Sequence, residues 1–157
     1  MSKLQTPFRY DFVGSFLRPQ ALKDAKTAYQ AGEISKEQFD KAADEEIAKV
    51  VAKQKELGFH IITDGEFRRT FWHLDFMWGF EGVAHELTDN GVQFNDELAV
   101  LEDTYLVGKI KAKAHPFVEY FKFLKQFEDE NTVAKYTIPA PAQTFQQMII
   151  PSNFKTT

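Results

Sequence analysis

The chain has 157 residues, the length of one ordinary domain, so a single domain spanning residues 1–157 is predicted. Hydrophobic residues make up 43% of the chain and aromatic residues 15%, enough for a buried core, which argues against a disordered protein. The 19 basic and 23 acidic side chains give a net charge of -4, so neither nucleic acid nor an anionic membrane is an expected partner.

Two helices are predicted in the first third of the chain. Pro19 suits the first turn of a helix that runs to about Gln30. A longer helix begins at Ser35, where the Ser-Lys-Glu-Gln sequence has the form of a capping box, and ends at Gly58. Its apolar side chains fall on an arc of roughly 120°, and the expected core residues are Phe39, Ala43, Ile47, Val50, Val51 and Leu57. The two helices are expected to form a helical hairpin.

Short apolar runs predict the strands. Residues 10–13 end at Gly14 and residues 59–63 end before Asp64, so two parallel strands separated by helices are expected, as in a βαβ unit. Further strands are predicted over 104–112 and 133–138, and helices over 116–127 and 143–150. The hydrophobic segment 71–80 fits neither period, and Asn90-Gly91 within 88–97 predicts a turn in a hairpin or loop insertion. The fold class is therefore α/β.

Polar side chains follow three of the predicted strands, in loops 13–19, 63–69 and 137–141. The carboxyl ends of parallel strands meet at one edge of a sheet, so these loops are expected to lie together. Ser15 and Arg18 suit an anion such as a carboxylate. The second loop carries two carboxylates and two guanidinium groups, those of Asp64, Glu66, Arg68 and Arg69. Taken singly, each feature also fits an ordinary turn or a solvated surface, but together they favour a binding site.

Segments 11–19 and 62–69, with the helical hairpin between them, resemble the amino-terminal part of the catalytic barrel of cobalamin-independent methionine synthases, in particular the shorter single-barrel branch called methionine synthase II. The resemblance runs from about Tyr10 to Pro141. It implies a partial (β/α)8 TIM barrel made of the first few βα units. It also implies a methyltransferase of methionine biosynthesis, which moves a methyl group from a methyl-folate to the thiol of homocysteine.

In that family the Gly-Ser loop and the glutamate of the Gly-Glu pair bind the amino-acid part of homocysteine or methionine. These roles carry over to Gly14, Ser15 and Glu66 as substrate-binding residues. A carboxylate suits an α-ammonium group, and hydroxyl and N–H donors suit an α-carboxylate. Asp64 stands where the full-length synthase has His, and Arg69 falls on an arginine of the family motif. The expected supporting residues are Arg18, Asp64, Arg68 and Arg69.

The resemblance also implies a catalytic zinc ion, held by one His, one Glu and two Cys beyond the matched stretch. This chain has no Cys, and its histidines share no metal-ligand spacing, whether His60, His73, His85 or His115. No metal site is therefore predicted in it, and zinc and methyl-folate are expected only for a full-length enzyme. Because a TIM barrel takes about 250 residues, a truncated chain that is inactive alone is expected. The alternatives are a complete small α/β domain, a non-catalytic amino-acid-binding module, and a self-associating fragment.

A partial barrel leaves an unpaired strand edge and an apolar sheet face, which a second copy would cover. A homo-oligomer, most simply a dimer, is therefore expected, with contacts through 71–80 and 148–150. No run reaches the ~20 apolar residues of a membrane span, and the first ten residues lack the apolar core of a signal peptide. The expectation is a soluble cytoplasmic protein whose partner is a small-molecule amino acid.

Overall fold

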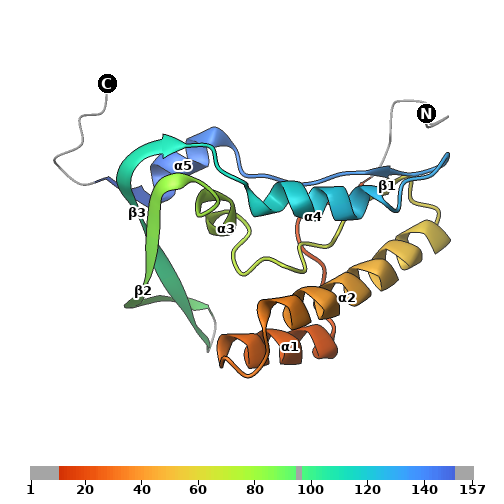
Figure 1. Ribbon diagram of the computed structural model, residues 1–157, viewed down its shortest axis with the longest axis horizontal. Helices are drawn as coiled ribbons and strands as arrows, with labels where there is room; N and C mark the ends of the chain where they lie inside the picture. Colours follow the sequence, from red (N-terminus) through yellow and green to blue (C-terminus); the bar gives the residue numbers. More distant parts are fainter. Residues whose placement is uncertain (1–10, 95–96, 151–157) are drawn as a thin grey trace. The chain divides into compact units, whose positions relative to one another are not determined.

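The computed structural model describes residues 11–94 and 97–150 as a mixed α/β chain (Figure 1). None of the helices in these two ranges is both long and apolar enough to span a membrane. Within the described residues, unit 1 comprises the chain up to Trp72 together with Glu119–Thr137, and unit 2 comprises His73–Val118 together with the chain from Ile138 onward. The elements in chain order are α1 (Gln20–Gln30), α2 (Lys36–Glu56), β1 (Ile61–Ile62), α3 (Leu74–Met77), β2 (Glu81–Phe94), β3 (Glu97–Lys111), α4 (Pro116–Lys125), β4 (Val133–Ala134), α5 (Pro141–Gln147) and β5 (Met148–Ile149).

The predicted helical hairpin is confirmed, and α1 lies beside α2 in Figure 1. The capping box forms at the start of α2, because the Ser35 hydroxyl accepts the N–H of Gln38 and the Gln38 side chain accepts the N–H of Ser35. Gly58 follows α2 with φ +79°, the left-handed conformation that ends many helices. Pro19 caps α1 from just outside its first turn.

The core of unit 1 is built on the inner face of α2. Val50 is only partly buried. Leu57 is 61% exposed, so its prediction as a core residue is wrong: it caps the carboxyl end of α2, beyond the last turn that faces the core. The buried members of the core are Leu22, Phe39, Ala43, Ile47, Val51, Ile62, Phe67 and Leu124.

The strands predicted over 59–63 and 133–138 are confirmed, although each is shorter than expected. β1 and β4 pair in parallel, with Ile61 opposite Val133 and Ile62 opposite Ala134. The carbonyl of His60 accepts the N–H of Val133 at 2.8 Å, which extends the ladder by one bond beyond β1. This pairing places the loop after β1 beside the residues that follow β4.

The strand predicted over 10–13 is wrong for its described residues, and Tyr10 lies outside the described residues. Val13 is 83% exposed, and residues 11–13 are not in a strand. The ring of Phe12 packs 4.2 Å from that of Phe59 and 4.7 Å from that of Phe16, while Asp11 pairs with Lys135. The segment is thus held by side chains instead of a backbone ladder, and the parallel pair of unit 1 is β1 with β4.

Unit 2 contains a long antiparallel hairpin of β2 and β3, which confirms the strand predicted over 104–112 and the hairpin insertion. The strands reverse within the predicted stretch 88–97, but not at Asn90-Gly91, because the pairing continues as far as Phe94 opposite Glu97. Instead the register moves from Leu87 opposite Glu102 to Gly91 opposite Val100, so residues 88–90 face residue 101 alone and form a bulge. The ladder overrides a local turn signal here.

Two further predictions in unit 2 need correction. The hydrophobic segment 71–80 contains the short helix α3. The helix predicted over 143–150 is α5, which stops at Gln147, and the following residues form β5. β5 pairs in parallel with β3, with Met148 opposite Thr104. Two residues of the predicted self-association contact 148–150, Met148 and Ile149, therefore pair with a strand of the same chain.

An ion pair between α2 and the loop after α4 predicts a pH effect on the stability of unit 1. Lys55 Nζ lies 2.7 Å from Asp129 Oδ2 and, with the N–H of Asn131, lowers the pKa of Asp129 to about 2. An aspartate in an unfolded chain has a pKa of about 3.9, so this stabilisation is present above that pH and is lost as the pH falls toward 2. Urea unfolding between pH 5 and 2 should show this loss of stability. Asp129→Asn should remove the part of the pH dependence that Asp129 contributes. Identical pH profiles for the two proteins would contradict the assignment.

Candidate functional site

The end of β1 is held by a side chain of α2. Gln54 is 3% exposed, and its Oε1 accepts the N–H of Thr63 at 2.9 Å while its Nε2 donates to the carbonyl of Thr63 at 2.8 Å. The amide thus satisfies both backbone groups of Thr63, which a neighbouring strand would otherwise do. The loop that leaves β1 therefore starts from a fixed backbone position.

The next turn has an unusual backbone conformation at two successive residues. Gly65 has φ +65° and Glu66 has φ +58°. A Cβ atom on Gly65 would lie 2.9 Å from a ring carbon of Phe16, so position 65 needs glycine for space as well as for conformation. The hydroxyl of Thr63 accepts the Gly65 N–H, and Asp64 Oδ1 accepts the Glu66 N–H at 2.9 Å. A left-handed non-glycine residue costs free energy, and such residues concentrate at functional sites.

The carboxylate of Glu66 is 6% exposed and is oriented through one of its two oxygens. Oε1 accepts a hydrogen bond from Arg69 Nη1 at 3.1 Å and another from Thr137 Oγ1 at 2.7 Å. Among the described residues, no hydrogen bond reaches Oε2. A buried, oriented carboxylate with one available oxygen can accept a hydrogen bond from a cationic ligand.

Arg69 is the counter-ion of this carboxylate and is itself 2% exposed. Its guanidinium also donates to the carbonyl oxygens of Trp72 and Thr137, and it lies 4.9 Å above the ring of Tyr136. The sequence predicted Arg69 and the loop that contains Thr137. It carried no signal that the threonine hydroxyl would touch Glu66, because the two residues are 71 positions apart.

The Gly-Ser loop lies against this turn. The N–H of Phe16 donates to the carbonyl of Gly65 at 3.1 Å. Gly14 has φ +86°, and Ser15 is exposed with a hydroxyl that makes no hydrogen bond to another described residue. The structure therefore brings the two predicted loops together, with the Ser15 hydroxyl one residue from the backbone contact.

Arg18 is turned toward the protein and not toward solvent. Its Nη2 donates to the carbonyl of Glu66 at 3.1 Å and to that of Arg69 at 2.9 Å. Lys26 of α1 also donates to the Arg69 carbonyl, at 3.3 Å. Both cations therefore hold the backbone of loop 63–69, so Arg18 supports Glu66 through the chain.

The Arg68 side chain contacts helices α2 and α4. Its side chain is 4% exposed, pairs with Asp44 of α2, and lies 4.9 Å and 5.0 Å from the rings of Tyr120 and Phe123 of α4. A cavity of about 220 Å³ beside Arg68 is lined by α1, α2 and Tyr120, and neither Ser15 nor Glu66 lines it. Arg68 therefore contributes to helix packing.

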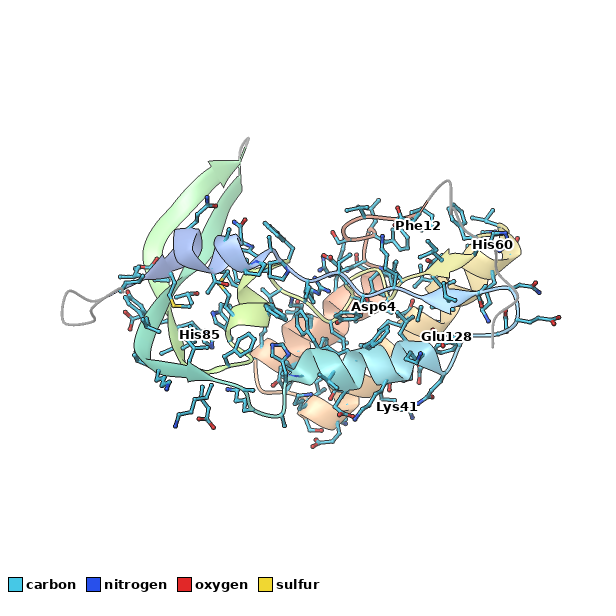
Figure 2. The ribbon with its side chains drawn as sticks, turned by 90° about the horizontal axis from the view of Figure 1, so that it is seen from above. Phe12, Lys41, His60, Asp64, His85 and Glu128 are labelled. Carbon is cyan, nitrogen blue, oxygen red and sulfur yellow. The ribbon has the colours of Figure 1, made fainter. Side chains whose placement is uncertain are left out.

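Asp64 is the other buried carboxyl group of the turn, with 3% exposure, and is labelled in Figure 2. Burial raises the pKa of Asp64, while the Glu66 N–H, the nearby guanidinium groups of Arg69 and Arg68, and the Tyr136 hydroxyl act in the opposite direction. Burial also raises the pKa of Tyr136. Asp64 thus faces an interior that disfavours its charged form.

This chain does not carry the ligand types of the zinc site that the resemblance implies. The chain has no Cys, and residues 11–94 and 97–150 contain no group of three or more His, Asp or Glu side chains placed to hold a metal ion. The donor set therefore does not fit a thiolate-bound zinc ion.

Comparison with known proteins identifies relatives of this chain. The family model for the catalytic domain of cobalamin-independent synthases matches residues 9–122. The uncharacterised protein YxjH of Bacillus subtilis is 38% identical over 141 residues, which are 90% of this chain and 37% of that protein. A 5-methyltetrahydropteroyltriglutamate–homocysteine methyltransferase of Bradyrhizobium diazoefficiens is 28% identical over 81% of this chain and 16% of that protein.

Two solved structures have the same fold over most of the chain. A Listeria monocytogenes protein assigned as a vitamin-B12-independent methionine synthase has a TM-score of 0.78 and 39% identity, over 95% of this chain and 41% of that one. A B12-independent methionine synthase from Shewanella sp. W3-18-1, in complex with selenomethionine, has a TM-score of 0.60 and 20% identity, over 79% and 35%. The chain thus spans well under half the length of these relatives.

Proposed function

Because the chain belongs to the cobalamin-independent methionine synthase family, we propose that it forms the first βα units of a (β/α)8 barrel that binds the amino-acid part of homocysteine or methionine. The proposed reaction of the full barrel is methyl transfer from a methyl-folate to the homocysteine thiol. The parallel pair β1–β4 of unit 1, with the Gly-Ser loop bonded to the turn that follows β1, is compatible with the start of such a barrel.

The observation that carries the proposal is the state of the Glu66 carboxylate. Arg69 and Thr137 hold Oε1, so the available Oε2 is oriented to accept a hydrogen bond from the α-ammonium group of the ligand. The exposed Ser15 hydroxyl, on the loop tied to Gly65, is the proposed donor to the α-carboxylate. This division matches each charged end of an amino acid with a group of opposite polarity.

Thiol activation by zinc is outside what this chain's residues support, since they do not fit that ion. The proposed activity of the chain on its own is therefore amino-acid binding without methyl transfer. Binding needs only Glu66, Ser15 and the turn that orients them, all of which lie in unit 1.

Calorimetric titration with L-methionine tests the proposal. Glu66→Gln is expected to weaken binding by about 1.5–3 kcal/mol, the range for hydrogen bonds to charged groups. The ligand loses the carboxylate that faces its ammonium group, while the amide keeps a similar shape. Glu119→Gln is the matched control, because Glu119 lies on the exposed side of α4 and pairs with Lys122. Equal affinities of wild type and Glu66→Gln would reject the proposed role of Glu66.

A further inference from the structure

Asp64 is a buried acid that the proposed binding contacts do not use. It is 3% exposed. Burying a carboxyl group costs free energy, so its presence in the turn needs a compensating role. The Oδ1 atom indicates that role.

Asp64 Oδ1 accepts the backbone N–H of Glu66 at 2.9 Å. This residue two positions later has φ +58°, and it is the only non-glycine among the described residues with a positive φ. Side-chain acceptance of an N–H two residues ahead is the Asx turn, which offers the backbone an alternative to regular structure. The hydrogen bond therefore stabilises the conformation that glutamate disfavours.

The direction of the Glu66 side chain depends on this conformation. At a negative φ the Cα–Cβ bond of Glu66 would point elsewhere, away from the positions where Oε1 meets Arg69 and Thr137. We propose that Asp64 is a positioning residue that holds Glu66 left-handed, so that its carboxylate faces the ammonium group of the ligand. The inference rests on the proposed function for the identity of that ligand.

The hydrogen bond at Oδ1 does not require a charge on Asp64. Burial favours the neutral form of this carboxyl group, and Arg69, Arg68 and the Tyr136 hydroxyl are the groups that act on it. Asparagine carries the same Oδ1 acceptor at the same distance from the backbone. The proposal therefore separates two substitutions: Asp64→Asn keeps the positioning contact and Asp64→Ala removes it.

Amide hydrogen exchange at Glu66, followed by NMR without ligand, tests the contact directly. In Asp64→Ala the Glu66 amide is expected to exchange about tenfold faster or more, because its acceptor is lost, whereas in Asp64→Asn it should stay within about threefold of wild type. Unchanged protection of the Glu66 amide in Asp64→Ala overturns the proposal. If Asp64→Ala does not fold, loss of protection in a folded Asp64→Asn overturns it as well.

Calorimetry with L-methionine tests the consequence for binding. Asp64→Ala is expected to weaken affinity about tenfold, and Asp64→Asn should restore it to within about threefold. In a Glu66→Gln background Asp64→Ala should cost little more, because both changes act on the same carboxylate. Equal losses of affinity in Asp64→Ala and Asp64→Asn, each adding fully to the loss in Glu66→Gln, would overturn the proposal. Removal of the Asp64 charge would then explain both losses.

The two arms also separate this inference from the proposed function. If wild type does not bind L-methionine, the proposed function fails, and hydrogen exchange still decides whether Asp64 holds Glu66. If wild type binds L-methionine and a folded Asp64→Ala protein binds it equally well, the role of Asp64 is rejected and the proposed function stands.

Discussion

Arg69→Met is expected to lower the free energy of unfolding by about 3–5 kcal/mol, the cost of breaking one partner out of a buried ion pair. Arg69 and Glu66 have side chains that are 2% and 7% exposed, so solvent screens neither charge. Methionine fills much of the volume but leaves the Glu66 carboxylate without its counter-ion. The carbonyl oxygens of Trp72 and Thr137 also lose a donor. Urea unfolding followed by far-UV circular dichroism measures the change.

The double variant Arg69→Met/Glu66→Gln is the control for this explanation. Removing both charges should recover part of the lost stability, because the uncompensated carboxylate is the main cost. Glu66→Gln by itself should be milder than Arg69→Met. A double variant that is less stable than Arg69→Met would contradict the assignment of Arg69 as the counter-ion.

Gln54→Leu is expected to cost about 2–6 kcal/mol, because it leaves two buried backbone groups of Thr63 unpaired at about 1–3 kcal/mol each. The N–H and the carbonyl of Thr63 both bond to the Gln54 side chain, and Thr63 is 5% exposed. Leucine is close in size, so the loss reports hydrogen bonding and not a cavity. The same unfolding experiment measures it.

Two further variants make this result specific. Gln54→Glu can make both bonds to Thr63 only as a neutral carboxylic acid, because its carboxylate would be buried against the Thr63 carbonyl, so relative to wild type it should be less stable at neutral than at mildly acidic pH. Gln126→Leu, on the exposed surface after α4, should stay within about 0.5 kcal/mol of wild type. Equal stability of Gln54→Leu and Gln126→Leu would show that the amide does not hold the end of β1.

Features whose partners lie a few residues apart were predictable. The capping box at Ser35 joins residues three positions apart, and the left-handed end at Gly58 depends on one residue. The apolar run 59–63 was recognisable as a buried strand because a strand that is buried on both faces has an uninterrupted apolar sequence. Ile61 and Ile62 are both buried. Local signals failed at Asn90-Gly91, where pairing of Gly91 with Val100 carries the ladder past a favourable turn sequence. The single domain and the self-association stay predictions.

The residue types of the candidate site could be predicted, but their orientations could not. Gly14, Ser15 and Glu66 were identified from motifs in short loops. The contacts of Arg18 join residues 48 and 51 positions apart, and that of Thr137 with Glu66 joins residues 71 positions apart. A guanidinium or hydroxyl group bonds whichever acceptor the folded chain brings within reach, so its partner is a property of the packing of β1, β4 and their loops and not of the neighbouring residues.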